Sequence, residues 1–275
     1  MKTAHIASSL FACMTLSLAG CHSGPGTHSN PALNDELPLI GVHQLQLADG
    51  VTETEFEAFV NGPLADLWSE PIGGIQVFVT KADRGIEEGS YTATWAFDSK
   101  AVRDSYFPDP STVTALFEEK VGSRISDVQE AFQKMAPSTG FTDYVVMFET
   151  EPSKGIDGPS LYGVHSFTLR PDVSNEEFEE FIMSSYADAW KKPIAGIGHA
   201  ILKGERGEET GEYKLVIRFS PASLRDRYVP SPTTLSAEFI QNVQPKLPKE
   251  VSDRFESMIE RQGFTDWAPV PAPKK

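Results

Sequence analysis

Two histidines at matching places in the chain are the side chains best suited to acid–base chemistry. His43 ends the triplet Gly41-Val42-His43, and the same triplet returns with His165 at its end. An imidazole titrates near neutral pH, so either histidine is a candidate general base. The alternative is a hydrogen-bonded core histidine, because each shares a strand face with apolar residues. His199 of the second copy corresponds to Val77 of the first, so the two copies differ at this position. Such a difference is expected of a specialised site, and equally of a surface position that is free to vary.

Arginine and tyrosine side chains form a second set of candidates. Arg84 and Arg206 stand in matching Arg-Gly turns, where a guanidinium could hold a carboxylate ligand. The alternative is a solvated turn tied by its own weak ion pairs. Tyr106 and Tyr228 close matching Arg-Asp-x-Tyr segments. Their hydroxyls are ligand-binding candidates, and the alternative is that Arg and Asp bridge helices while Tyr packs beneath the prolines that follow.

Several kinds of chemistry lack their sequence patterns. We find no Gly-rich phosphate loop, no Gly-x-Ser-x-Gly nucleophile turn, and no His/Asp/Glu cluster with metal-ligand spacing. We therefore expect no metal and no cofactor. The formal net charge of -15 argues against nucleic acid as a partner, because neutralising phosphates requires clustered Lys and Arg.

The N-terminus has the pattern of a targeting segment. A short basic start, Met1-Lys2, precedes an apolar stretch from Ile6 to Leu18, which is too short to span a bilayer. The following Leu18-Ala19-Gly20-Cys21 resembles a bacterial lipobox. The resemblance implies cleavage before Cys21 and its lipidation with diacylglycerol and an acyl chain such as palmitate. The alternative is an ordinary secretory signal with a chance cysteine.

This resemblance also implies a location and a membrane partner. A lipid-anchored chain would lie in the bacterial cell envelope, and His22 in place of Asp favours the outer membrane, facing the periplasm. Cys13 would leave with the signal, so the mature chain would hold no free thiol and no disulfide.

Most of the remaining chain is one sequence present twice. Residues 41–147 match residues 163–270, and the closing Gly140-Phe141-Thr142-Asp143 returns as Gly263-Phe264-Thr265-Asp266. A repeat of this length indicates a duplicated domain. We divide the chain into a signal peptide (1–20), a lipidated tether (21–39), a first repeat (40–148), a linker (149–160), a second repeat (161–270) and a tail (271–275).

Each repeat is expected to contain a strand, a helix, a strand hairpin, further helices and a last strand. The strands are expected at 42–48, 75–81, 91–97 and 142–148, and in the second repeat at 164–169 and 265–269 with a matching hairpin. Capping boxes at Thr52 and Ser174 start the first helix of each repeat. Gly62-Pro63 should kink that helix in the first repeat only. Ser220-Pro221 is expected to cap a later helix in the second repeat.

The order βαββαβ is ferredoxin-like. Two such units in tandem resemble the dimeric α+β barrel superfamily, which includes antibiotic-biosynthesis monooxygenases, EthD-like and NIPSNAP-like proteins, chlorite dismutases and dye-decolourising peroxidases. The resemblance implies an α+β fold in which two four-stranded sheets close one eight-stranded barrel within a monomer, as an internal pseudo-dimer. Haem-binding members use an axial histidine on a helix. Here the histidines that follow the predicted cleavage site lie in the tether or on predicted strands, so we expect no haem.

Strand alternation predicts a mixed barrel interior. The inward residues are expected to be Gln44, Gln46, Thr92, Thr94, Ser166, Thr168, Lys214, Val216 and Arg218, and Arg218 joins the ligand-binding candidates. An eight-stranded barrel can be filled by side chains or hold one small ligand. We predict an envelope lipoprotein that binds a small molecule. One alternative is a cofactor-independent monooxygenase or isomerase that uses His43 or His165, and the other is a structural or interaction protein with a filled barrel.

Overall fold

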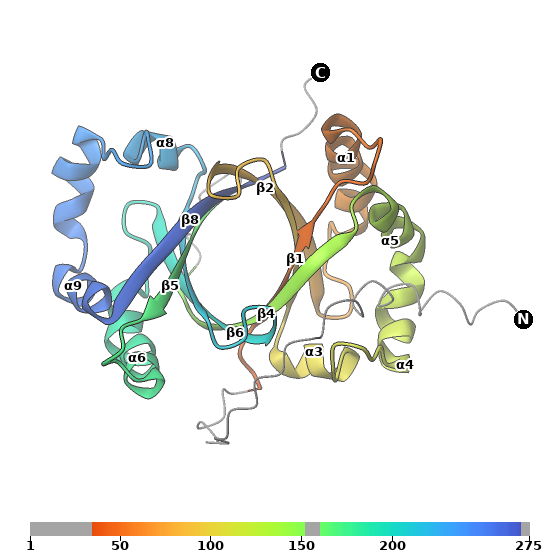
Figure 1. Cartoon of the computed structure of the whole chain (residues 1–275), viewed down its shortest axis with the longest axis horizontal. Helices are drawn as coiled ribbons and strands as arrows, with labels where there is room; N and C mark the ends of the chain where they lie inside the picture. Colours follow the sequence, from red (N-terminus) through yellow and green to blue (C-terminus); the bar gives the residue numbers. More distant parts are fainter. Residues whose placement is uncertain (1–34, 152–159, 271–275) are drawn as a thin grey trace, which may run out of the picture.

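Eight antiparallel strands close into one barrel, with helices packed outside it (Figure 1). The computed structural model describes residues 35–151 and 160–270. The predicted signal, the lipidation site Cys21 and the tail lie outside the described residues. No helix within the described ranges is long and apolar enough to cross a membrane.

The first half of the described chain, residues 35–151, supplies four strands and three helical segments. Its elements are, in order, β1 (Leu39–Leu45), α1 (Glu53–Phe59), η2 (Val60–Leu64), α2 (Ala65–Leu67), β2 (Ile75–Gly85), β3 (Tyr91–Phe97), α3 (Lys100–Tyr106), α4 (Ala115–Phe117), η3 (Glu118–Gly122), α5 (Ser123–Met135) and β4 (Ser138–Glu149).

The second half, residues 160–270, follows the same order. Its elements are β5 (Leu161–Leu169), α6 (Asn175–Phe181), η4 (Ile182–Tyr186), α7 (Ala187–Trp190), β6 (Ile197–Gly207), β7 (Tyr213–Phe219), α8 (Leu224–Tyr228), η5 (Phe239–Val243), η6 (Gln244–Lys246), α9 (Lys249–Met258) and β8 (Ile259–Pro269).

The two halves meet along two seams. The order around the barrel is β1-β3-β2-β8-β5-β7-β6-β4, so β2 pairs with β8 at one seam and β4 with β6 at the other. All neighbours are antiparallel, and β2 and β6 therefore run in the same direction. Both hairpin turns, 86–90 and 208–212, consequently lie at the same mouth of the barrel, which faces the viewer in Figure 1. The predicted eight-stranded closed barrel is confirmed.

Each half buries an apolar core between its sheet and its helices. In the first half, Phe56 packs edge-on against Tyr91 with ring centroids 5.1 Å apart. In the second, Phe178 packs against Tyr213 at 4.9 Å. Since the helices cover only the outer face of the sheet, the inner face is left to line the barrel. This division between outer and inner faces determines which side chains can reach a ligand.

The first helix of each half differs from the sequence prediction. The Thr52 capping box is present, with the Glu55 amide donating to the Thr52 hydroxyl over 3.2 Å. The expectation that only the first repeat is kinked is wrong, because η2 and η4 are wide π-helical turns at matching positions. In the second half the Ser184 hydroxyl donates to the Glu180 carbonyl at 2.6 Å, and such back-bonding loosens the helical ladder without proline.

The prediction that Ser220-Pro221 caps a helix is also wrong. Helix α8 begins at Leu224, and its N-cap residue is Ser223. The Ser220 hydroxyl lies 2.5 Å from the Ser160 hydroxyl instead, so it pairs with the segment that enters β5.

Candidate functional site

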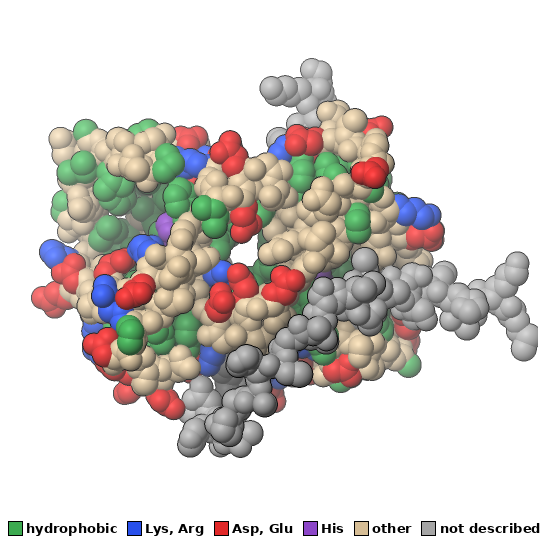
Figure 2. Space-filling view, in the orientation of Figure 1, with side chains coloured by type: hydrophobic (Ala, Val, Ile, Leu, Met, Phe, Trp, Pro, Cys, Tyr) green, Lys and Arg blue, Asp and Glu red, His purple; other side chains and the backbone are tan. Residues whose placement is uncertain are grey.

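A cavity of about 360 Å³ lies inside the barrel. Figure 2 shows its mouth as a hollow between the two halves, with acidic side chains beside it. Much of its wall is apolar and comes from strands of both halves: Ile40, Val42, Phe78, Val146, Val164, Leu202 and Val216.

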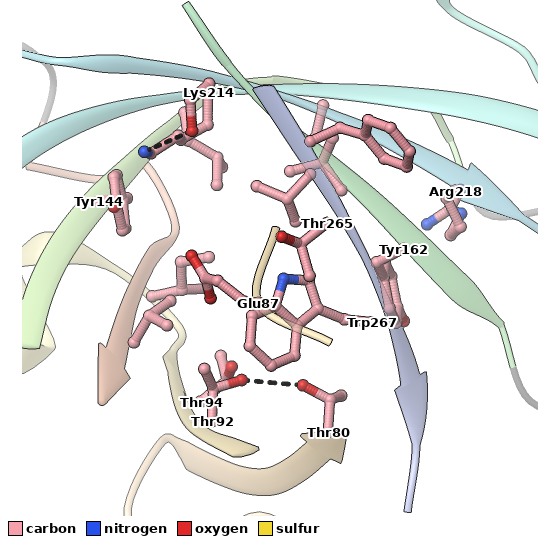
Figure 3. A pocket seen from close by; sticks show the side chains of 18 of the residues that line it. Thr80, Glu87, Thr92, Thr94, Tyr144, Tyr162, Lys214, Arg218, Thr265 and Trp267 are labelled. Carbon is pink, nitrogen blue, oxygen red and sulfur yellow. Dashed lines mark hydrogen bonds between the residues drawn. The ribbon is translucent and has the colours of Figure 1, made fainter. Parts of the chain in front are cut away.

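Trp267 is the largest side chain that enters this cavity from the wall. It comes from β8, which crosses the barrel beside β2 and β5, and Figure 3 shows its indole projecting into the open space. Tyr144 occupies the matching place on β4 and faces the cavity from the other half. The two aromatic residues differ in size and polarity, so the cavity is not symmetric.

A network of polar groups lies near the hairpin mouth. The Lys214 ammonium donates to Glu209 at 2.8 Å and to the Ser166 hydroxyl at 2.9 Å. The Tyr144 hydroxyl also donates to Glu209. Burial raises the pKa of Tyr144 well above its usual value, so this hydroxyl stays protonated at neutral pH.

Glu87, from the hairpin of the first half, faces the same space. Its carboxylate forms no hydrogen bond or ion pair with the residues that the structure describes. Burial raises the pKa of Glu87 above its usual value, and the negative charge of Glu209 adds to the effect while Lys214 opposes it.

The opposite end of the cavity holds a second ion pair. The Arg218 guanidinium donates to Glu149 at 2.7 Å and to the carbonyl of Thr150 at 3.1 Å. Tyr162 stands close by on β5, and burial raises the pKa of its hydroxyl. Lys214 and Arg218 both face inward from β7, roughly 13 Å apart along the strand. Two cations therefore frame the cavity, and each is already neutralised by a glutamate.

Most of the predicted interior residues do line the cavity. Those that do are Gln44, Thr92, Thr94, Ser166, Lys214, Val216 and Arg218. Gln46 and Thr168 do not, since both lie beyond its edge. Thr92 forms a hydroxyl pair with Thr80 at 2.9 Å.

His43 and His165 lie on the outer face of the sheet, not in the cavity. Their rings stack on matching phenylalanines, Phe141 and Phe264, with centroids 5.7 and 5.5 Å apart. Burial lowers the pKa of each imidazole to about 4. Both are therefore neutral at physiological pH and packed as part of the structure, and this placement argues against either acting on a ligand inside the barrel.

His199 borders the cavity but is held from the helix side. Its Nδ1 lies 2.6 Å from the Tyr186 hydroxyl, and its ring stacks on Trp190 with centroids 3.6 Å apart. Burial lowers its pKa to about 3. The loss of symmetry at this position thus corresponds to a buried Tyr–His–Trp stack present in one half.

Arg84 and Arg206 lie at the seams and do not line the cavity. Arg206 donates to Asp143 at 2.9 Å and to the carbonyl of Phe107 at 2.8 Å. Arg84 makes the matching bonds to Asp266 at 2.9 Å and to the carbonyl of Val229 at 3.0 Å. Each arginine therefore binds a carboxylate of the other half and not an external ligand.

The Arg-Asp-x-Tyr segments complete these seam clusters. Arg103 forms ion pairs with Asp143 and Glu205, and its side chain is 1% exposed. Arg225 matches it, binding Asp266 at 2.5 Å and also Asp83. Each cluster thus joins residues of both halves across a seam.

The tyrosines of these segments are buried in the cores of their own halves. The Tyr106 hydroxyl donates to the Gly73 carbonyl at 2.8 Å, and that of Tyr228 to the Ala195 carbonyl at 3.2 Å. Neither lines the cavity, so the structure places both outside the candidate site.

The sequence does not predict Trp267, Thr265, Tyr144, Tyr162 or Glu87 as site residues, although all of them line the cavity. The available signal was alternation along the last strand, where Thr265 and Trp267 share a face. The sequence predicts that strand to start at 265, whereas β8 starts at Ile259.

Comparisons with known proteins support the fold. No protein-family model and no curated protein matches the sequence. A solved candidate monooxygenase of Lactobacillus acidophilus is 15% identical with a TM-score of 0.54, covering 86% of this chain and 98% of its own. A candidate monooxygenase of Fusobacterium nucleatum is 11% identical with a TM-score of 0.49, covering 85% of this chain and 93% of its own. The strand order shows a closed eight-stranded α+β barrel within a single chain, and the first of these likenesses supports the same fold.

Proposed function

We propose that the protein binds a small, largely apolar molecule inside the barrel. The observation that carries this proposal is an open cavity in which several polar groups have no partner. The hydroxyls of Thr94 and Thr265 and the indole N–H of Trp267 make no hydrogen bonds with the described residues, yet all three side chains line the cavity. Because these polar atoms face the open space of the cavity and have no protein partner in the described ranges, a bound molecule or water can form hydrogen bonds with them.

The dimensions and lining fit this role. The volume of about 360 Å³ lies in the range of small-molecule pockets, and a few polar groups among apolar walls are typical of such sites. These features favour a binding barrel over the filled barrel of a purely structural protein.

Native mass spectrometry of the purified full chain tests the proposal. A bound molecule should appear as reproducible extra mass, or apolar fragments should bind when added. Val216→Phe, which fills the cavity from β7, should remove that binding. Thr168→Phe is the matched control, because Thr168 lies on β5 outside the cavity. Equal binding by both variants, or none by the native chain, would refute the proposal.

A cofactor-independent monooxygenase or isomerase is the second candidate. The structural likeness to the candidate monooxygenase of Lactobacillus acidophilus is the reason to consider this function. Such a reaction needs a base beside the substrate, and in this alternative the base would be Glu87, because His43 and His165 lie outside the cavity. If the compound bound to the native chain is recovered chemically unchanged after aerobic incubation, the alternative fails. Turnover that Glu87→Gln abolishes without loss of binding would support it.

We further infer that Cys21 anchors the protein to the bacterial envelope through lipid, in the outer membrane facing the periplasm. The lipobox-like Leu18-Ala19-Gly20-Cys21 after an apolar stretch supports this, and more than one acyl chain gives stable anchoring. Labelling with a palmitate analogue should mark the native chain and not Cys21→Ser. An unlabelled native chain in the soluble fraction would refute the inference.

We also propose that each half is a ferredoxin-like repeat, 40–148 and 161–270, descended from one duplicated unit. The identical element order and the matching seam residues support this. A monomer with an internal pseudo-dimer is the expected oligomeric state, and sedimentation analysis of the full chain would test it.

A further inference from the structure

The charges that line the cavity do not balance. Three carboxylates border it, Glu87, Glu149 and Glu209, against two cations, Lys214 and Arg218. Lys214 pairs with Glu209 at 2.8 Å, and Arg218 pairs with Glu149 at 2.7 Å. Glu87 is therefore left without a counter-ion among the described residues.

The surroundings of Glu87 make an unpaired charge costly. Its side chain is partly buried, and both Glu87 and Trp267 line the cavity. The ammonium of Lys214 instead donates to Glu209 and to the Ser166 hydroxyl. Burial raises the pKa of Glu87, and the charge of Lys214 opposes this rise without reversing it while Glu209 adds to it, as expected of a carboxylate with no direct cation partner.

We propose that the molecule bound in the barrel carries a cationic amine, which forms an ion pair with Glu87 and lies against the indole of Trp267. This inference rests on the proposed binding function and specifies the class of ligand. An ammonium group would supply the missing counter-ion, and the π-face of tryptophan attracts cations. The remaining apolar part of the ligand would contact the aliphatic wall.

An anionic ligand fits this cavity less well. Both lining cations already hold carboxylates, so an anion would have to displace Glu209 or Glu149, and it would meet Glu87 as a like charge. A neutral alcohol would leave Glu87 without a counter-ion.

The test uses three probes of nearly equal shape: 3-phenylpropylamine, 3-phenylpropanol and 3-phenylpropanoate. Each is titrated into the full chain by isothermal calorimetry at neutral pH. We expect the amine to bind about tenfold or more tighter than the alcohol, since it gains an ion pair and a cation–π contact. The carboxylate should bind most weakly.

Two variants locate the preference. Glu87→Gln should abolish the advantage of the amine over the alcohol, and circular dichroism with a thermal melt shows whether the variant is folded. Glu88→Gln is the control, because it removes one charge from the same hairpin at an exposed position outside the cavity and should retain the preference. Trp267→Phe should weaken the binding of the amine by several-fold.

The outcomes separate the two proposals. If the alcohol binds as tightly as the amine, or if Glu88→Gln removes the preference as fully as Glu87→Gln, the cationic ligand is refuted while the binding barrel stands. If none of the three probes binds at millimolar concentration and Val216→Phe leaves the mass spectrum unchanged, both proposals fail.

Discussion

Removing one buried carboxylate from a seam should strongly destabilise the barrel. The side chain of Asp266 is 5% exposed and forms ion pairs with both Arg84 and Arg225, whose side chains are 17% and 7% exposed. Asp266→Asn keeps the shape of the side chain and leaves two nearly buried guanidinium groups without their shared carboxylate. Breaking a buried ion pair by removing one partner costs roughly 3–5 kcal/mol.

The surrounding contacts reduce that cost. Arg225 keeps its ion pair with Asp83, and Arg84 keeps the carbonyl of Val229. We therefore expect the lower end of the range, a loss of about 3 kcal/mol in the free energy of unfolding.

Urea unfolding followed by circular dichroism measures this loss through the midpoint and slope of the transition. Asp226→Asn is the matched control, because Asp226 binds the same Arg225 with a side chain that is 71% exposed, and exposed pairs contribute less than about 1 kcal/mol. Equal losses in the two variants would refute the view that the seam clusters hold the halves together. Asp143→Asn should behave like Asp266→Asn, since it occupies the matching position at the other seam.

Three further predictions follow from the fold. Gly85→Ala should lower the free energy of unfolding by at least about 2 kcal/mol, because φ is +119° and the added Cβ would lie 2.3 Å from a carbonyl oxygen of β8. Gly89→Ala is the control, since Gly89 has a φ of +88° but open space around it. It should lower the free energy of unfolding clearly less in the same urea assay. Burial lowers the pKa of His43 and His165 from 6.5 to about 4, so the unfolded chain takes up protons first as the pH falls. The free energy of unfolding should therefore be fully retained above pH 6.5 and decline toward pH 4, and thermal melts should show a shallower decline in His43→Gln combined with His165→Gln. Either half expressed alone should dimerise or aggregate, because its seam strands lose their partners; a stable monomer in sedimentation analysis would contradict this.

Internal repetition revealed the seam residues but not their role. Gly41, Arg84, Gly85, Arg103 and Asp143 all recur in the second half, and the interpretations offered for the arginines were a ligand clamp, local ion pairs or helix bridging. Their partners lie in the other half of the chain, and spacing within one repeat cannot reveal such contacts.

The glycine at matching positions 41 and 163 is also explained by contacts with residues far away in the sequence. A Cβ on Gly41 would lie 2.8 Å from an oxygen of Asp143, and one on Gly163 would lie 3.0 Å from an oxygen of Asp266. The glycine of the first strand therefore leaves space for the seam carboxylate, and its recurrence follows from that packing.

The cavity was only partly predictable. Simple alternation placed Lys214 and Arg218 correctly, because β7 is regular and pairs without a shift on both sides. Glu87 follows an irregularity between Ala82 and Arg84, where the pairing of β2 with β8 shifts. Glu87 itself lies in the turn 86–90, beyond the end of β2 at Gly85, so strand alternation could not show that its side chain turns inward.

The two classes of residue differ in symmetry. The seam residues are the same in both halves, whereas several cavity residues have diverged. Lys214 corresponds to Thr92 of the first half, Arg218 to Ala96 and Trp267 to Tyr144, although Glu87 and Glu209 match each other. Two identical halves would build a cavity with two-fold symmetry, which offers a ligand two equivalent orientations. Fusion of the halves allows each wall to change independently while the seams stay fixed. A molecule that has an amine at one end and an apolar body at the other would bind this diverged cavity in a single orientation, with the amine at Glu87 and Trp267.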